Sequence, residues 1–390
     1  MKKRKIIAVT GARSEYDLLY SVYLKLNNDE RFDFSIIITG SHLSDSFGYT
    51  AQYVEKDGFK IAGKAFSLID SNQKIGRIVS MGTQISSLAN MLWHEKPDIV
   101  LVAGDREEAI TVTMTCAYLD IPVAHFFGGD VAKDGNIDNS VRYAASKFAH
   151  IHFPSLPQHR ETLLKLGEDD SRIFVVGNPA LDRIISTPYL DKSVLFKNLA
   201  VQNKKIGRYC VLIQHPIITQ VEQQKEHIKI TLDSILETED LHCFVNYPNS
   251  DAGFGEIIKA YQEYSNKFPD KFTLFKNLDR INYINLLRNA EFLIGNSSSG
   301  VVEVASLGLA AINVGERQRG RLHGNNIIFT DNDKKQIEAA IYKVLNDEDF
   351  RSVVAQKINP YGDGQATERI VETLANISLD KTLVYKNITY

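Results

Sequence analysis

The chain has 390 residues, of which 44% are hydrophobic and 24% charged, so it is long enough for roughly two domains with cores of their own. Intrinsic disorder and fibrous repeats are excluded. The 45 lysines and arginines and 48 aspartates and glutamates give a net charge of −3, which provides no overall field to attract nucleic acid or an anionic membrane. Its three cysteines (Cys116, Cys210 and Cys243) are widely spaced and form neither a disulfide framework nor a C-x-x-C metal pair, so we expect a cytoplasmic protein.

Short β-branched runs alternate with segments of helical period along nearly the whole chain, which is typical of parallel α/β sheets. In the first half, the expected strands are residues 5–10, 34–39, 99–104, 122–127, 151–153 and 172–176. The basic residues 2–5 resemble the start of a signal peptide, but the apolar run after them is too short. No stretch approaches the ~18 apolar residues that span a bilayer.

The regular alternation of strand and helix patterns stops after Val176. Gly and Pro residues and a lysine-rich stretch there indicate a linker over 179–207. A second series of strands is expected at residues 209–214, 243–247, 272–275, 292–295 and 311–314. We therefore predict an α/β fold with Rossmann-like domains at 1–178 and 208–362, followed by a C-terminal helix and tail at 363–390. Two doubly wound halves imply that ligands bind in a cleft at the carboxyl ends of the strands.

Several common cofactor motifs are absent. Residues 58–64 resemble a P-loop, but Ala65 stands where the loop requires a hydroxyl for Mg²⁺. No G-x-G-x-x-G follows the first strand, which argues against a dinucleotide site. No H-E-x-x-H or other compact cluster indicates a metal site, so we expect no cofactor.

The strongest local motif is the sequence GNSSSG at residues 295–300, where an expected strand turns into a helix that carries Glu303. Backbone N–H groups and hydroxyls at such a turn suit a phosphate, although an ordinary helix cap is the alternative. The next strand is followed by Arg317, Arg319 and Arg321, whose guanidinium groups favour a diphosphate. Glu303 would then accept the hydroxyls of a ribose.

Ionisable residues follow several expected strands of the first half. They are Arg13, Glu15, Asp105, Arg106, His125, Asp130, Asp138 and Arg142. Taken singly, each is explained by helix capping or by a first-turn acid, but three acids after successive strands indicate chemistry. In the second half His215 also ends a strand and would face the cleft, with a structural histidine as the alternative.

In this order, the motifs resemble those of the hydrolysing UDP-N-acetylglucosamine 2-epimerases and their relatives that act on UDP-2,4-diacetamido-trideoxy sugars. The pieces that carry the resemblance are Arg13 with Glu15 and Tyr16, Gly104-Asp105-Arg106, His125 with Gly128-Gly129, Ile137 to Arg142, Gln214-His215-Pro216, Pro248-Asn249 with Asp251-Ala252-Gly253, Asn296-Ser297-Ser298, and Arg317-Gln318 with Gly320-Arg321. The resemblance covers nearly the whole chain. It implies a GT-B arrangement with the active site in the interdomain cleft, a C-terminal helix that crosses back to the first domain, and a homodimer or homotetramer.

The resemblance also implies residue roles. Ser297, Ser298, Glu303 and Arg317 would hold the diphosphate and ribose, and Leu278 would lie near the uracil. The catalytic set around the sugar would be Asp105, Asp130, Asp138 and His215. Further substrate-binding residues would be Arg13, Glu15, Arg106, His125, Arg142, Asn249 and Arg321. The family usually has Gly-Gly-Glu where this chain has an aspartate, Asp130, followed by a loop at 131–136 that is slightly longer, which makes Asp130 the departure from the pattern.

The implied reaction begins with elimination of UDP to a 2-acetamido-glycal, and hydration of the glycal then gives a free ManNAc-type sugar for sialic or legionaminic acid synthesis. Elimination and hydration involve no net redox change, so neither NAD nor a metal is required. A non-hydrolysing epimerase, which returns UDP to the glycal, and a GT-B glycosyltransferase, which needs an acceptor, are the alternatives. The partner is thus a UDP-sugar, with no nucleic acid and no membrane.

Overall fold

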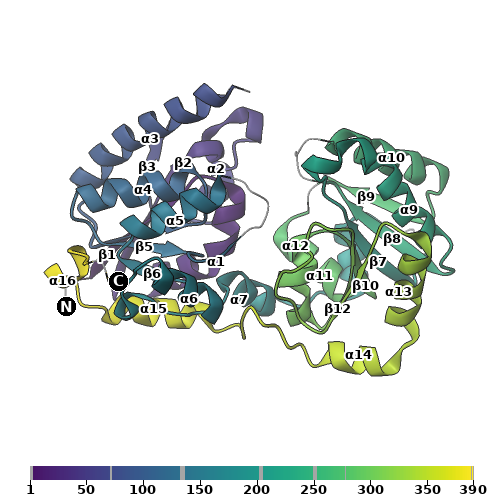
Figure 1. Ribbon diagram of the computed structural model, residues 1–390. Helices are drawn as coiled ribbons and strands as arrows, with labels where there is room; N and C mark the ends of the chain where they lie inside the picture. The colour runs from purple at the N-terminus through teal and green to yellow at the C-terminus, as the bar shows by residue number, and fades with distance from the viewer. Residues whose placement is uncertain are drawn as a thin grey trace. The chain divides into compact units, whose positions relative to one another are not determined.

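The computed structural model describes residues 3–70, 73–131, 137–201, 205–248, 253–276, 278–387 and 389. The chain divides into two compact units. Unit 1 comprises Met1–Arg183 and Gly362–Tyr390, and unit 2 comprises Ile184–Tyr361. Each unit is built around one six-stranded parallel sheet, and their elements are labelled in Figure 1. The predicted α/β class with two parallel sheets is therefore confirmed.

In unit 1 the strand order is β3-β2-β1-β4-β5-β6. In this doubly wound order, β2 and β3 are added on one side of β1, and β4 to β6 are added on the other side. The strands are β1 (Arg4–Thr10), β2 (Phe32–Thr39), β3 (Ile61–Ala65), β4 (Ile99–Ala103), β5 (Val123–Phe126) and β6 (Ile151–Phe153). The helices are α1 (Arg13–Asn28), α2 (Ala51–Lys56), α3 (Lys74–Glu95), α4 (Glu107–Tyr118), α5 (Asp138–Phe148), α6 (Pro157–Lys165), α7 (Pro179–Ser186), α15 (Ala366–Asn376) and α16 (Lys381–Val384), with short 3-10 helices η1 (Gly40–Leu43), η2 (Asp45–Phe47) and η3 (Asp170–Arg172).

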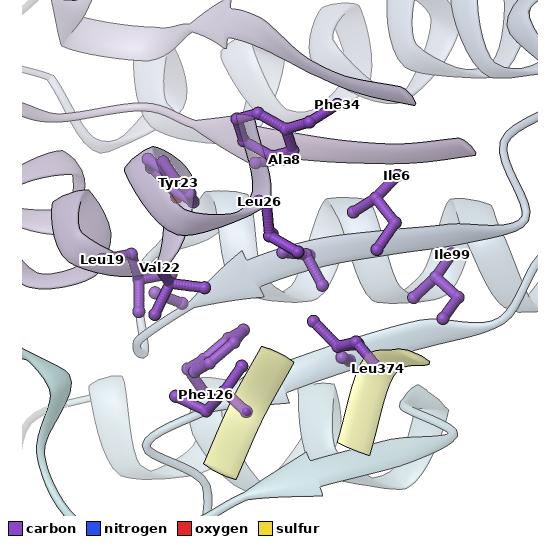
Figure 2. Packing of buried hydrophobic residues seen from close by; sticks show 14 of the residues in the cluster. Ile6, Ala8, Leu19, Val22, Tyr23, Leu26, Phe34, Ile99, Phe126 and Leu374 are labelled. Atoms are coloured by element: carbon purple, nitrogen blue, oxygen red, sulfur yellow. The ribbon is translucent and has the colours of Figure 1, made fainter. Parts of the chain in front are cut away.

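Helices cover both faces of this sheet because alternate residues of β1 point to opposite sides. Ile6 and Ala8 belong to the core shared with α1 and α15, and Figure 2 shows Leu19, Val22 and Leu374 converging on that face. The other face holds Ile7 and Val9 with residues of α3 and α4. Burial on both faces explains the continuous apolar strands of the sequence.

Unit 2 repeats the topology, with strand order β12-β11-β10-β7-β8-β9. Its strands are β7 (Arg208–Ile213), β8 (Leu241–Asn246), β9 (Phe272–Phe275), β10 (Phe292–Gly295), β11 (Ala310–Val314) and β12 (Ile327–Thr330). Its helices are α8 (Lys192–Asn198), α9 (Gln224–Leu236), α10 (Phe254–Lys267), α11 (Arg280–Arg288), α12 (Ser298–Val302), α13 (Lys334–Asn346) and α14 (Glu348–Ala355), with 3-10 helices η4 (Ile218–Gln223) and η5 (Val304–Leu307).

Three expectations about secondary structure were wrong. The edge strands β3 and β12 were missed, and the segment with P-loop character overlaps β3. Residues 172–176, expected as a strand, form only an isolated bridge between His152 and Ile173. The stretch 179–207, expected as a linker, contains helices α7 and α8 in its described part.

The C-terminal segment belongs to unit 1, where Ile370 and Leu374 of α15 are fully buried in the core that includes β1 and α1. All three cysteines are buried free thiols. In the described part of the chain, none of the helices has the length and apolar character needed to span a membrane.

Candidate active site

Several predicted site residues follow the two central strands of each sheet, where the order of the strands changes direction. In unit 1 these are the neighbours β1 and β4, and in unit 2 they are β7 and β10. Open parallel sheets bind ligands just beyond the carboxyl ends of such strands. Arg13 and Asp105 follow the unit 1 pair, and His215 and Ser297 follow the unit 2 pair.

In unit 1, the buried guanidinium of Arg142 on α5 gathers two of the predicted acids. It donates to the Asp105 carboxylate and to the backbone oxygen of Asp130 at 2.7 Å. It also donates to the Asn139 side chain at 3.1 Å. Charge-assisted bonds of this kind fix geometry more firmly than neutral ones. Arg142 therefore ties the loops after β4 and β5 to α5.

Asp138 is the first residue of α5, so it lies one helical turn from Arg142. Its carboxylate is 3.9 Å from the Arg77 guanidinium of α3. Arg77 also pairs with Glu107 at the start of α4. The sequence did not point to Arg77, because it lies far upstream and no motif surrounds it.

Asp130, the departure from the family pattern, has a half-buried side chain. Its Oδ1 accepts from the backbone N–H of Val131 at 2.8 Å and lies 3.4 Å from His159 Nε2. Gly129 before it has φ of +79°, and a Cβ there would overlap the His159 backbone, so the turn requires glycine. Residues 132–136, where the longer loop was expected, lie outside the described residues.

Two predicted arginines flank this cluster. Arg13 at the start of α1 is half-buried, 3.8 Å from Asp17 and 4.7 Å from the Tyr53 ring centre. Arg106 is exposed at the turn into α4. Both follow the central strands, where they can meet an anionic ligand.

Glu15 and His125 were expected to contact substrate, but the structure places both in the interior, with exposed fractions of 7% and 0%. His125 Nε2 donates to the backbone oxygen of Gly104 at 2.7 Å, and its Nδ1 is 3.1 Å from Ser146 Oγ. Burial lowers the pKa of His125 to about 4, so the ring is neutral at physiological pH. His125 therefore supports the turn before Asp105.

In unit 2, the buried side chain of Asn296 joins the ends of β7 and β10. Its Oδ1 accepts from the His215 backbone N–H at 2.7 Å, and its Nδ2 donates to the His215 backbone oxygen at 2.8 Å. Gly295 before it has φ of +121°, and a Cβ there would overlap the backbone of Ile213. Glycine at this position is required for the close approach of the two strand ends.

The arginine loop after β11 returns to the same turn. Arg317 Nη1 and Gln318 Nε2 each donate to the Asn296 backbone oxygen at 3.1 Å. Arg321 donates to the Gln318 side chain at 3.0 Å, whereas Arg319 pairs with Asp331. The structure thus brings Arg317, Arg321 and the GNSSSG turn together. Asn296 and Gln318 link them, a role that the sequence motifs containing these two residues did not predict.

The helix after this turn is shorter than expected. The α12 helix ends at Val302, and its Ser297 cap accepts from the Ser299 N–H at 3.3 Å. A helix of five residues has only a small dipole, so a phosphate here would depend on N–H groups, the exposed Ser298 hydroxyl and Arg317. Glu303 lies 3.6 Å from Arg280, and its buried Oε2 has no hydrogen-bond partner in the described ranges.

Leu278 and Asn249 were also expected to contact the substrate. Leu278 is half-buried and packs against the core of unit 2 just before α11. Asn249 lies outside the described residues.

The sequence matches a known protein family over most of its length. A family model described as UDP-N-acetylglucosamine 2-epimerase matches residues 24–375. The chain belongs to this epimerase family.

Several relatives of this epimerase cover almost its full length. It is 33% identical over 99% of its chain to the whole of a hydrolysing UDP-N,N'-diacetylbacillosamine 2-epimerase of Legionella pneumophila. It is 34% identical, over 99% of each chain, to a hydrolysing GDP/UDP-N,N'-diacetylbacillosamine 2-epimerase of Campylobacter jejuni. The crystal structure of UDP-GlcNAc 2-epimerase from Neisseria meningitidis bound to UDP-GlcNAc shares the fold, with a TM-score of 0.75, 19% identity, and coverage of 95% of this chain and 99% of that one.

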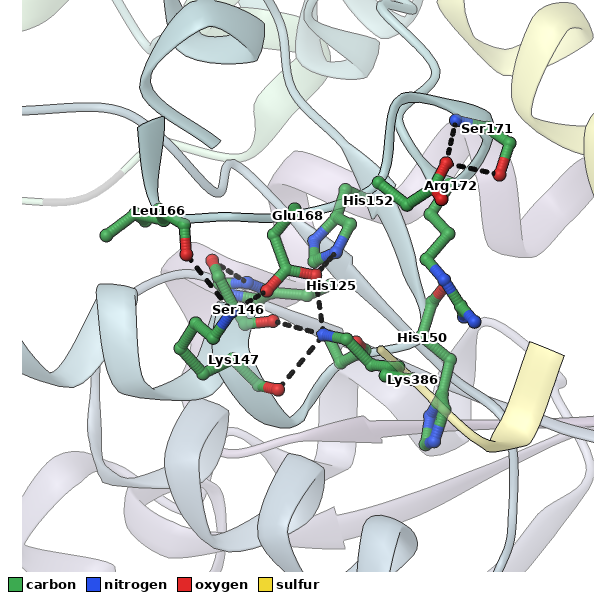
Figure 3. Close-up of polar contacts among 12 residues, drawn as sticks. His125, Ser146, Lys147, His150, His152, Leu166, Glu168, Ser171, Arg172 and Lys386 are labelled. Carbon is green, nitrogen blue, oxygen red and sulfur yellow. Dashed lines mark hydrogen bonds and ion pairs between the residues drawn. The ribbon is translucent and has the colours of Figure 1, made fainter. Parts of the chain in front are cut away.

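In this family member, a buried ionic cluster anchors the helix that carries Asp138 and Arg142 (Figure 3). Lys386 donates to the backbone oxygens of Ser146, Lys147 and Ala149 at the end of α5, at 3.3, 3.0 and 2.6 Å. It also pairs with Glu168 at 2.5 Å, and Glu168 accepts from His152 at 2.9 Å. A cation at a helix C-terminus satisfies its last carbonyls and complements its dipole.

Proposed function

We propose that this chain is a hydrolysing UDP-sugar 2-epimerase that converts UDP-GlcNAc, or a UDP-2,4-diacetamido-trideoxyhexose, and water into UDP and the free 2-epimeric sugar. Family membership supports the class of reaction. The observation that carries the proposal is the placement of Asp105, Asp130 and Asp138 around α5, where Arg142 binds the Asp105 carboxylate and the Asp130 backbone, because inversion at C2 needs proton carriers for both faces of the sugar.

The C2 proton of a 2-acetamido sugar has no adjacent carbonyl to acidify it, so a base alone is insufficient. When the C1–O bond to UDP breaks, the departing UDP takes the electron pair and C1 becomes electron-poor. Loss of the C2 proton to a carboxylate then gives the C1=C2 double bond of a glycal. Water adds its oxygen to C1, and a proton returns to the opposite face of C2.

Unit 2 is suited to the departing diphosphate. Arg317 and the N–H groups of residues 297–299 lie at one turn, and such fixed donors stabilise charge that develops in the transition state. Glu303 is suited to the ribose, because its Oε2 is a buried acceptor without a hydrogen-bond partner among the residues that the structure describes. His215, held through its backbone by Asn296, is proposed to assist the leaving group.

Unit 1 is suited to the proton transfers. Asp105 and Asp138 are proposed as the pair that works on the two faces of C2, each held by an arginine. Asp130 is the third member of the set, and its side chain is one methylene shorter than the family's glutamate.

Hydrolysing relatives at 33% and 34% identity support free sugar as the product. The test is a ¹H NMR assay of the purified chain with UDP-GlcNAc and, separately, UDP-N,N'-diacetylbacillosamine. Free 2-epimer and equimolar UDP are expected with at least one substrate. A UDP-linked epimer with no free sugar would instead identify a non-hydrolysing epimerase, and no reaction without an acceptor would favour a glycosyltransferase.

A further inference from the structure

Two glutamates outside the proposed proton-transfer set lie together beneath the Asp105 turn. Glu15 comes from α1 after β1, and Glu108 comes from the first turn of α4 after β4. Glu15 Oε2 accepts from the Gly11 backbone N–H at 3.2 Å. The Glu108 carboxyl lies against the same glycine, on the side where a side chain would project. Both carboxyl groups therefore lie against Gly11.

Two glycines make room for this arrangement. A Cβ on Gly11 or on Gly40 would overlap the Glu108 carboxyl, and Gly40 also has φ of +58°. Across the site, Glu15 Oε1 approaches Gly104 at ordinary packing distance, 3.8 Å from where a Cβ would be. The pair thus fills the space behind the ends of β1, β2 and β4, directly under the turn that presents Asp105.

Both carboxyl groups are more than nine-tenths buried. Within the described part of the chain, Glu15 Oε1 has no hydrogen-bond partner, although an ionised carboxylate oxygen in the interior needs one. Burial, and next the charge of Glu108, raise the pKa of Glu15 to about 8, whereas Arg106 opposes this rise. Burial also raises the pKa of Glu108, although its own backbone N–H, Arg106, Gln84 and Arg77 each lower it. The other titratable groups that face the pair are Asp105 and Tyr23.

We propose that Glu15 and Glu108 share one proton and that this shared hydrogen bond positions residues 104–106 for the reaction. Two adjacent buried carboxyls avoid being ionised together, so one proton joins them and leaves a single negative charge facing Arg106. The Glu15 carboxyl then packs beside Gly104, whose backbone oxygen accepts from His125. Glu15 and Glu108 are positioning residues, because they act through the turn and not on the sugar.

The proposal has a defined pH direction. The folded state holds the proton more tightly than the unfolded chain, so the stabilisation is complete below the ordinary glutamate pKa and is lost as the pH rises through about 8. Above that pH two carboxylates repel each other beneath the turn. At one pH unit above such a pKa, roughly a tenth of the molecules retain the shared proton.

The decisive measurement is infrared difference spectroscopy of the substrate-free full-length chain between about pH 7 and pH 9. Wild type should lose the carbonyl band of a protonated carboxylic acid. Glu108→Gln, whose amide donates permanently to Glu15, should show no such loss, and Glu15→Gln provides a second test if that variant folds poorly. The control Glu107→Gln removes a neighbouring carboxylate that pairs with Arg77 and should show the same loss of the band between about pH 7 and pH 9 as wild type.

A second readout rests on the proposed function. The kcat of wild type should fall by about tenfold from about pH 7 to pH 9, and in Glu108→Gln the ratio of the two values should approach one. A wild-type spectrum in which no carbonyl band disappears between about pH 7 and pH 9, or a Glu108→Gln variant that shows the same loss as wild type, would overturn the shared proton. If the chain turns over no UDP-sugar, the proposed function fails while the infrared result still decides the state of the pair.

Discussion

Arg317 is one of two side chains that join the arginine loop to the GNSSSG turn, through its bond to the Asn296 carbonyl. If its guanidinium also binds the diphosphate, Arg317→Gln should weaken UDP binding by about 10- to 100-fold, because a hydrogen bond to a charged group contributes about 1.5–3 kcal/mol. Isothermal titration of the full chain with UDP measures the change.

A matched control lies two residues along the same loop. Arg319 pairs with Asp331 at 2.7 Å, so Arg319→Gln should leave the dissociation constant for UDP within about twofold. Equal weakening by both substitutions would show that the loop acts only through its overall charge.

For single residues, the sequence predicted site residues best where charged side chains follow the end of a strand. Asp105, Asp138 and Arg317 were named from such positions, and the structure places each in a cluster with other polar groups. Glu108 was passed over because an acid in a helix first turn is ordinary. Its environment depends on Gly11 and Gly40, whose approach arises only when β1, β2 and β4 lie side by side.

Among the elements, α5 is held at both ends by ionic contacts, and its C-terminus depends on Lys386. Lys386→Met removes the donors to the last carbonyls of α5 and leaves the fully buried Glu168 carboxylate short of a partner. Removing one member of a buried pair costs about 3 kcal/mol or more. Denaturant unfolding of the full chain measures the loss, and Lys381→Met, at an exposed position of α16, should change stability by less than about 0.5 kcal/mol.

The stability that the Lys386–Glu168 cluster contributes should decrease in acid. Burial alone would raise the pKa of Glu168, but the bonds from His152, Lys386 and Lys147 outweigh it and hold the pKa at about 2. The stabilisation is therefore present above the ordinary glutamate pKa and is lost as the pH falls toward 2. Lys386→Met should flatten this acid slope, and an unchanged slope would contradict the role given to Lys386.

Predicting the elements worked for the central strands and for the edge strands β6 and β9, and it failed at the other edge of each sheet. The missed strands β3 and β12 are both edge strands, and β3 contains Gly63 and Lys64, which weaken an apolar pattern. Residues 172–176 have strand composition but find only one bridge. Arg172 instead donates to the backbone oxygens of Thr382 and Leu383, a contact with the distant C-terminus that local pattern does not contain.

At the scale of the whole molecule, the chain leaves unit 1 after Arg183 and returns to it at Gly362. Periodicity predicted two parallel sheets because each strand and helix is a local signal. The return of the C-terminal segment to unit 1 is a contact between α15 and α1, more than 300 residues apart, and only the family resemblance suggested it beforehand.

The proposed roles of the two units, diphosphate binding in unit 2 and proton transfer in unit 1, predict different footprints for two ligands. UDP should slow amide exchange in unit 2, around residues 295–303 and 315–321, and leave residues 104–108 and 137–148 of unit 1 unchanged. An intact UDP-sugar with an inactive Asp105→Asn enzyme should protect both sets. UDP at about 100 times its dissociation constant should also stabilise the folded state by about 2.7 kcal/mol. Protection by UDP confined to unit 1 would contradict the assignment.

The most direct test of the account follows hydrogen at C2 in D₂O. For wild type, each free sugar formed should carry one deuterium at C2, and UDP should accumulate in equal amount. In the Asp105→Asn, Asp138→Asn double variant, deuterium entry and UDP release should fall together by about 10²- to 10⁴-fold. Free sugar that keeps its original C2 hydrogen, or a double variant with undiminished exchange, would contradict the claim that these carboxylates move the C2 proton as UDP departs.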